Sequence, residues 1–397
     1  MNPIEIIFWI CVAIVFYAFL GYGILLYALV KLKRLFTKSA KRYTTHFEPL
    51  VTLVIPCYNE QDILAEKIAN CKKLDYPSDK LKLVFITDGS TDGSESYLAA
   101  WPEIKVLHES RRAGKTAAEN RVMKYVDTPF VIFSDANTML NTAAVREIVK
   151  HFADEKVGCV SGEKKIISEA SDSASAAGEG IYWKYESFLK KLDSELYSAV
   201  GAAGELVAFR TSLYQDLPED TLLDDFMQSM QIAANGYKIV YESDAYATES
   251  ASMNVKEELK RKVRISAGGW QSIVRLSGKL TLARTPLLWF QYISHRVLRW
   301  TITPFCLIAI FALNIALALQ GSAFYTIILA AQVLFYVAAI IGLILENRKL
   351  RLKAVFVPYY FTIMNYAVLA GLKKFLSGKQ QGAWDKAQRK AISLPHP

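Results

Sequence analysis

Four long apolar segments constrain this chain more than any other feature of its sequence. Residues 4–30, IEIIFWICVAIVFYAFLGYGILLYALV, contain a single charged side chain, that of Glu5. A helix of this length rises about 40 Å, which exceeds the bilayer hydrocarbon core of about 30 Å. Three more apolar segments lie near the other end, at about 301–319, 323–345 and 354–372. We therefore predict an integral membrane protein with one span before, and three spans after, a large central block.

The first apolar segment is too long for the core of a signal peptide and lacks a basic leader, so we expect it to be retained. Basic runs follow it at 31–34 (KLKR) and separate the last two segments at 346–353 (ENRKLRLK). Lys and Arg concentrate on the cytosolic side of spans. This bias predicts a cytosolic central block at the inner membrane and both termini outside, although the carboxyl-terminal tail is itself basic.

The net charge of +9 is explained by Lys and Arg beside the spans, where they meet anionic lipid headgroups. We find no nucleic-acid-binding motif and expect no nucleic acid partner. The cysteines form no C-x-x-C pair, which argues against structural zinc and disulfides; they are Cys11, Cys57, Cys71, Cys159 and Cys306.

The central block alternates predicted strands and helices. Apolar β-forming runs occur at 50–56, 81–87, 104–109 and 130–134, and helical spacing occurs at 59–74, after 91 and at 115–126. Such alternation predicts an α/β fold with a mostly parallel sheet covered on both faces. In these sheets, ligands bind beyond the carboxyl ends of the strands. Asp88 and Asp135 directly follow two strands, so together they suggest a nucleotide and a metal, although each alone is typical of a turn.

Two stretches at this edge offer groups for a nucleoside diphosphate and its cation. Asp135 and Asn137 lie two residues apart in SDAN, and a carboxylate with an amide oxygen suits Mg²⁺ or Mn²⁺. Asp88, in DGSTDG, offers a carboxylate to a ribose or base edge. Lys115 and Arg112, in RRAGKTAAEN, lie at a helix start and suit a diphosphate; a solvated basic turn is the alternative.

Two later stretches offer a base and a basic clamp. Asp224 and Asp225 precede an amphipathic helical run, where a carboxylate can accept the proton of an acceptor hydroxyl. A helix cap with a solvated neighbour is the alternative. Arg261 and Arg264 share one helical face and can clamp a diphosphate, and Trp270 can support a sugar ring. The alternative for this stretch is a basic helix at the membrane surface.

The ordered series VTLVIPCYNE, FITDGSTDGS, GKTAAEN, FSDAN, GAAGELVAFR, LLDDF and RKVRISAGGW resembles the family 2 glycosyltransferases, which are inverting enzymes of the GT-A fold. The likeness covers about residues 45–300 and is closest to the membrane-embedded chitooligosaccharide, poly-N-acetylglucosamine, hyaluronan and cellulose synthases. It implies that Asp88 contacts the nucleoside, that Asp135 and Asn137 form the metal motif, and that Asp225 is the base beside Asp224. Asn137 stands where the family usually has a second aspartate.

The resemblance also places Arg261 and Arg264 in the family's Gln-x-x-Arg-Trp motif, which here is Arg-Lys-Val-Arg-Ile. The final Trp, which lines the acceptor entry in processive synthases, is missing, and this puts long-chain processivity in doubt. Trp270 is the candidate replacement.

These predictions divide the chain into five parts. Residues 1–34 are a transmembrane helix, 45–255 a cytosolic GT-A domain and 256–298 interface helices with the Arg/Trp motif. Residues 299–372 form three transmembrane helices, and 373–397 form an amphipathic tail that contains the family-like GAWDKAQR. Within the domain, we expect the small-residue stretch SEASDSASAAGEG at 168–180 to be a mobile loop.

The expected enzyme is a metal-dependent, inverting hexosyltransferase. It transfers GlcNAc or glucose from a UDP-sugar to a growing β-linked oligo- or polysaccharide. One alternative adds a single sugar to a lipid acceptor, polyprenyl phosphate or diacylglycerol. Another is a non-catalytic membrane scaffold or lipid-linked-sugar transporter, and an oligomer or an export partner stays open. A soluble dehydrogenase is excluded, because no G-x-G-x-x-G follows the first strand.

Overall fold

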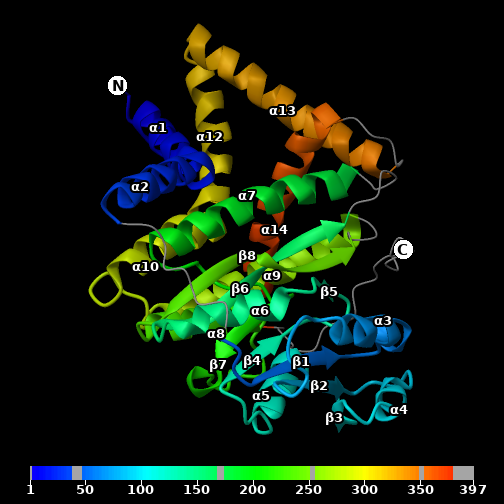
Figure 1. Cartoon of the computed structure of the whole chain (residues 1–397). Coiled ribbons are helices and arrows are strands. Elements are labelled where there is room, and N and C mark those ends of the chain that lie inside the picture. Colours follow the sequence, from blue (N-terminus) through cyan, green and yellow to red (C-terminus); the bar gives the residue numbers. More distant parts are fainter. Residues whose placement is uncertain (1, 38–46, 168–173, 251–254, 348–352, 379–397) are drawn as a thin grey trace.

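The computed structural model describes residues 2–37, 47–167, 174–250, 255–347 and 353–378 (Figure 1). Its centre is an eight-stranded sheet in the order β3-β2-β1-β4-β7-β6-β8-β5. The strands are β1 Val51–Cys57, β2 Leu81–Asp88, β3 Lys105–Glu109, β4 Phe130–Phe133, β5 Met139–Leu140, β6 Val157–Ile167, β7 Val207–Arg210 and β8 Lys238–Ser250.

The four strands predicted from the sequence form the parallel half of this sheet, with β1 between β2 and β4. The other half is mixed, because β7 runs antiparallel to both β4 and β6, while β6 and β8 are parallel. Successive residues of β1 alternate between two cores: Val51, Leu53 and Ile55 face one, and Val54 faces the other. Burial on both faces explains the continuous apolar run of this strand.

Helices cover both faces of the sheet. The first core contains residues of α3 Gln61–Lys72, α4 Ser94–Ala99 and α6 Ala144–Val149. The second contains residues of α5 Lys115–Met123 and α8 Asp224–Ala234. Two longer helices, α7 Ala174–Leu196 and α9 Val255–Leu276, lie between the sheet and the apolar helices (Figure 1).

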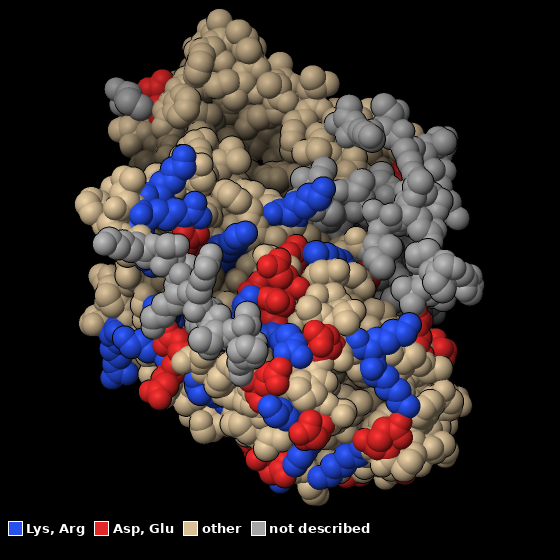
Figure 2. All heavy atoms as spheres, viewed as in Figure 1, with Lys and Arg blue, Asp and Glu red and all other residues tan. Residues whose placement is uncertain are grey.

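The described residues contain three helices that are long and apolar enough to cross a membrane, at Pro3–Phe36, Ala323–Glu346 and Val355–Leu376. A fourth span results if Pro286–Trp300 and Ile302–Ala318, which meet at 52°, count as one. Their elements are α1 Pro3–Phe16, η1 Tyr17–Gly21, α2 Tyr22–Phe36, α10 Pro286–Tyr292, η4 Ile293–Val297, α11 Leu298–Trp300, α12 Ile302–Ala318, α13 Ala323–Asn347 and α14 Lys353–Leu376. Charged side chains are concentrated away from the α12–α13 end (Figure 2). The apolar helices suggest an integral membrane protein, as predicted.

Buried polar contacts fasten the first apolar helix to the domain. The Asp193 carboxylate, on α7, accepts hydrogen bonds from the Tyr22 hydroxyl, from His295 Nδ1 at 2.6 Å and from Gln291 Nε2 at 2.9 Å. Since Tyr22 lies in α2 and His295 in η4, one carboxylate joins both ends of the apolar region to α7. Such a buried group is costly to expose, so these helices and the domain are expected to keep one relative position.

One sequence prediction is wrong in the described residues. Residues 174–180 belong to α7 rather than to a loop, because alanine is the strongest helix former and the other small residues do not prevent a helix. The end of α14 lies beside the domain, where Lys374 lines the same cavity as Asp225, and the carboxyl terminus that we expect outside lies beyond the described residues. The tail at 379–397, including GAWDKAQR, lies outside the described residues.

Candidate active site

A cavity of about 770 Å³ opens beyond the carboxyl ends of β1, β2 and β4. It is lined by nine of the ten predicted site residues: Asp88, Arg112, Lys115, Asp135, Asn137, Asp224, Asp225, Arg261 and Arg264. Trp270 is not among its lining residues; it is half-buried on α9. The parallel half of the sheet explains the position of the cavity, because β2 and β4 flank β1 and end at the same edge.

Asp88 ends β2 and is buried at 5% exposure. Its carboxylate accepts hydrogen bonds from the backbone amides of Ala113, at 3.1 Å, and Gly114, at 2.7 Å. Asp88 therefore fixes the loop that leads into α5. In this loop the Arg112 guanidinium stacks on Tyr58, 3.7 Å from the ring centroid, a contact that holds its charge at the cavity wall.

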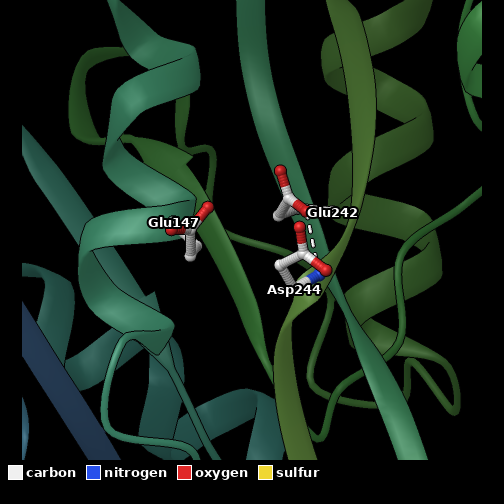
Figure 3. Close-up of side chains that lie close together, drawn as sticks. All are labelled: Glu147, Glu242 and Asp244. Atoms are coloured by element: carbon white, nitrogen blue, oxygen red, sulfur yellow. Dashed lines mark hydrogen bonds between the residues drawn. The ribbon is translucent and has the colours of Figure 1, made fainter. Parts of the chain in front are cut away.

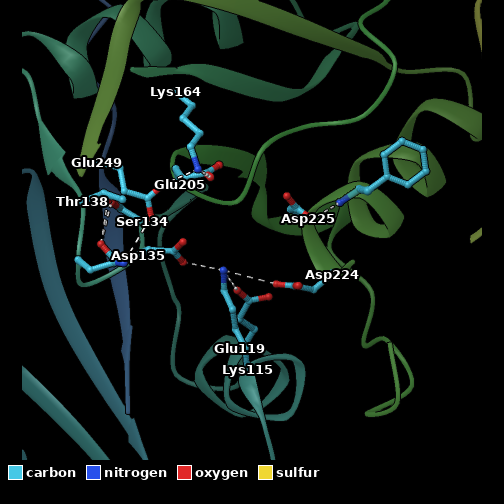
Figure 4. A network of polar contacts seen from close by, with 12 residues as sticks. Lys115, Glu119, Ser134, Asp135, Thr138, Lys164, Glu205, Asp224, Asp225 and Glu249 are labelled. Atoms are coloured by element: carbon cyan, nitrogen blue, oxygen red, sulfur yellow. Dashed lines mark hydrogen bonds and ion pairs between the residues drawn. The ribbon is translucent and has the colours of Figure 1, made fainter. Parts of the chain in front are cut away.

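Lys115, the first residue of α5, connects three carboxylates across the cavity (Figure 4). Its Nζ donates to Asp135 Oδ1 at 2.7 Å and lies 3.7 Å from Asp224 and 3.8 Å from Glu119. Burial lowers the pKa of Lys115, but the negative charges of Asp135, Asp224 and Glu119 outweigh burial and raise it well above its usual value. Lys115 is therefore a fixed positive charge near neutral pH.

Asp224 and Asp225 are the first two residues of α8. Burial and the neighbouring charge of Asp224 raise the pKa of Asp225 to about 7, against the lowering effects of Lys115 and the Phe226 amide. That amide donates to Asp225 Oδ1 at 2.7 Å and orients the carboxylate. A carboxyl group with a pKa near neutrality is suited to accept a proton from a hydroxyl group.

Asp135 and Asn137 lie on the turn that follows β4, and both line the cavity. Asn137 donates through Nδ2 to Glu249 at 3.4 Å, which leaves its Oδ1 for another contact. The Lys115 ammonium already sits on Asp135, so the carboxylate accepts a cation at this point. A carboxylate and an amide oxygen on one turn fit Mg²⁺ or Mn²⁺.

Behind this turn lies Lys67, which sequence reasoning missed. It is fully buried in α3, and its Nζ donates to Ser134 Oγ at 2.9 Å and to the Thr138 carbonyl at 2.7 Å. These two atoms flank Asp135 and Asn137, so the ammonium holds both ends of the turn. In the sequence, Lys67 resembles any other basic residue of an amphipathic helix, so only the tertiary fold reveals it.

A second missed group closes the cavity wall opposite Lys115 (Figure 4). Lys164, on β6, forms ion pairs with both Glu205 and Glu249, and its side chain is 1% exposed. Burial raises the pKa of Glu205, but Lys164 outweighs burial and lowers it below its usual value. Glu205 lines the cavity, and Glu249 contacts Asn137. The pairing of β6 with β8 brings Lys164 close to Glu249, and no local sequence motif indicates this contact.

Arg261 and Arg264 extend the cavity wall along α9. Arg261 forms an ion pair with Glu258 at 3.0 Å, one helical turn earlier. Burial lowers the pKa of Arg264, while Asp224 and Asp225 favour its charged form. Both arginines therefore line the same cavity as the carboxylates of the sheet edge.

A separate acidic cluster lies outside this cavity (Figure 3). Glu147, Glu242 and Asp244 place carboxylate oxygens within 4.8 Å of one another. Lys150 Nζ and His151 Nε2 already lie 3.0 Å and 2.7 Å from Glu242. Burial raises the pKa of Glu242, but its hydrogen bonds lower it to about 2. Glu242 therefore already has two basic partners, whereas the Asp135 turn opens onto the cavity.

Residues 52–217 match the family model described as Glycosyl transferase family 2. The poly-beta-1,6-N-acetyl-D-glucosamine synthase of Staphylococcus aureus is 27% identical over 237 residues, which are 57% of this chain and 56% of the synthase. The beta-monoglucosyldiacylglycerol synthase of Nostoc sp. is 28% identical over 167 residues, 40% of this chain and 34% of that enzyme. The chain thus spans about half the length, or less, of these curated relatives.

Among solved structures, a mannosyltransferase from Pyrobaculum calidifontis, in complex with GDP-Man and Mn²⁺, has a TM-score of 0.70. It is 24% identical in sequence, and the match covers 94% of this chain and 100% of that chain. This likeness extends over both the sheet and the apolar helices, so it supports the fold of the whole chain.

Proposed function

We propose that this chain, whose residues 52–217 match the family 2 glycosyltransferase model and which has the GT-A fold, transfers a sugar from a UDP-sugar to a growing β-linked oligo- or polysaccharide. GlcNAc and glucose are the proposed donor sugars. The observation that carries this proposal is the meeting of Asp135, Lys115 and Asp225 in one cavity at the carboxyl edge of the sheet. The proposed location is the inner membrane, with the domain in the cytosol.

Asp135 and Asn137 would hold Mg²⁺ or Mn²⁺, which neutralises charge on the leaving diphosphate. Lys115 and the two arginines of α9 add fixed positive charge around the same group. Asp88 orders the loop that carries Arg112 and lies where a nucleoside would bind. These groups position the donor and stabilise the negative charge that develops as its bond to the sugar breaks.

Asp225 accepts the proton of the acceptor hydroxyl. The hydroxyl oxygen attacks the anomeric carbon from the face opposite the diphosphate, which leaves with the bonding electron pair. A single displacement converts an α-linked donor into a β-linked product. The proposed pathway has no covalent sugar–enzyme intermediate, so Asp225 acts only as a base.

The second candidate, transfer of one sugar to polyprenyl phosphate or diacylglycerol, is favoured by a specific observation. An apolar helix, α14, contributes Tyr366, Ala370 and Lys374 to the cavity wall, so a lipid acceptor has access. The third candidate, a non-catalytic scaffold or transporter, is disfavoured because acidic side chains are present at each position that transfer requires.

The test is a donor screen on the detergent-solubilised full chain. UDP-GlcNAc, UDP-glucose and GDP-mannose are supplied with Mg²⁺ or Mn²⁺, and released nucleotide and product length are measured. We expect release of UDP that depends on the cation, together with a ladder of products. A single-addition product would favour the second candidate. Absence of nucleotide release with every donor and acceptor would contradict the proposal.

A further inference from the structure

One face of α14 forms part of the candidate active site. Tyr366, Ala370 and Lys374 are spaced four residues apart, so they lie on one side of this helix, and all three line the cavity. Residues Val355–Leu376 are also a candidate membrane span. The cavity that holds Asp225 is therefore bounded on one side by a helix whose composition suits a lipid environment.

Close packing makes α14 a fixed part of this wall. A Cβ atom added at Gly371 would lie 2.5 Å from Ser266 Cβ and 2.8 Å from the Ala267 backbone nitrogen. The two helices thus approach through a glycine, next to the α9 turn that carries Arg264. Tyr366, Ala370 and Lys374 of α14 and the two arginines of α9 therefore line the cavity in a fixed relative position.

Charge is unevenly divided between the two sides of the cavity. The sheet side is acidic on balance, because Arg112 and Lys115 are outnumbered there by the carboxylates of Glu60, Asp88, Asp135, Glu205, Asp224 and Asp225. The helix side is basic on balance, because Glu257 is outnumbered there by the two arginines and by Lys256, Lys260 and Lys374. Lys260 is paired with Glu257 at 2.8 Å, whereas Lys256 and Lys374 are exposed near the ends of α9 and α14. A neutral sugar chain has no group that matches these ammonium groups.

We propose that the acceptor is a saccharide linked to a lipid through a phosphate group, and that Lys374 and Lys256 bind this phosphate. The lipid chain extends along the Tyr366 face of α14, and an acceptor hydroxyl reaches Asp225. The phosphate takes no part in bond exchange: the new bond joins the acceptor oxygen to the anomeric carbon, the diphosphate leaves, and Asp225 takes the proton. This inference rests on the proposed function, because it names the acceptor of the same reaction.

The test compares two synthetic acceptors that share the sugar and the alkyl chain and differ in the linkage, which is charged in only one of them. One is a GlcNAc dodecyl glycoside, and the other is GlcNAc joined to dodecanol through a phosphodiester. The full chain in detergent is supplied with the donor that the screen identifies, and KM for each acceptor is measured. Lys374→Gln is the test variant. Lys373→Gln is the matched control, because Lys373 is the exposed neighbour at the same helix end but does not line the cavity.

We expect a lower KM for the phosphodiester and a rise of about fivefold in Lys374→Gln, which corresponds to ~1 kcal/mol for an exposed ionic contact. KM for the neutral glycoside, KM for the donor and the kinetics of Lys373→Gln should stay unchanged. Equal KM values for both acceptors, or equal effects of the two variants, would overturn the inference. Since the neutral glycoside still reports transfer, such a result leaves the proposed glycosyltransferase function intact, whereas loss of transfer to every acceptor contradicts that function itself.

Discussion

The pKa of Asp225 gives a quantitative expectation for the pH dependence of transfer. Burial and Asp224 raise it from an ordinary 3.8 to about 7. A base acts in its ionised form, so the acceptor-dependent rate should rise with pH, from about a tenth of its maximum at pH 6 to about nine tenths at pH 8. Burial contributes the largest part of this increase, and the charge of Asp224 contributes the second largest.

Removing the charge of Asp224, which is the second contribution to the raised pKa of Asp225, tests this reasoning. Asp224→Asn keeps the side-chain shape but removes the charge beside Asp225, so the acidic limb of the profile should move down by about one unit. Asp220→Asn is the control, because Asp220 precedes the same helix but pairs with Arg275 at 2.8 Å outside the cavity. The assay is kcat/KM for the acceptor at saturating donor between pH 5 and pH 9. If the acidic limb of the pH profile of Asp224→Asn stays in place or moves to higher pH, the charge of Asp224 does not raise the pKa of Asp225, and the reasoning is refuted.

Three further changes probe other parts of the structure. Lys67→Met should leave the Thr138 carbonyl without its donor, lower the free energy of unfolding by about 3 kcal/mol and raise the Mn²⁺ concentration needed for half-maximal rate. The control Lys72→Met, an exposed change on the same helix, should have neither effect. An unaltered Mn²⁺ requirement in Lys67→Met would contradict the role of Lys67 in positioning the Asp135 turn. Gly371→Leu should reduce both transfer and thermal stability, because the added side chain would meet Ser266 at the α9–α14 contact. The control Gly278→Leu, with open space around it, should have little effect. Equal transfer and equal thermal stability of the two variants would show that this contact is unimportant. Asp135→Ala should abolish the dependence of donor binding on Mn²⁺, measured by calorimetry, while a retained dependence would move the cation elsewhere.

Local sequence patterns were enough to predict that Asp88 and Asp135 lie at one cavity. Asp88 and Asp135 each follow an apolar run, and parallel strands end at one edge, so their proximity followed from the alternation of strands and helices. The parallel half of the sheet and the GT-A fold are confirmed. The antiparallel β7 was not predicted, because its four residues carry no pattern that fixes their direction.

The supporting residues were not predictable in the same way. Lys164 meets Glu249 only through the long pairing of β6 with β8, whose register is irregular between Gly162 and Glu163. Lys67 and Lys374 are typical basic residues of helices until the tertiary fold places one behind the Asp135 turn and the other at the cavity. Such contacts depend on how distant elements pack, and one sequence contains no local signal for that.

The most direct test of the central claim, that donor binding and proton removal meet in one cavity, is the comparison of Asp225→Asn with the unaltered protein. UDP-sugar binding in the presence of Mn²⁺ is measured by calorimetry, and transfer is measured by product formation. The structure predicts that the variant keeps its affinity for the donor, because Asp135, Lys115 and Arg264 are unchanged, and that transfer falls by at least about a hundredfold. Near-normal transfer by Asp225→Asn would contradict the assignment of the base and, with it, the proposed reaction geometry.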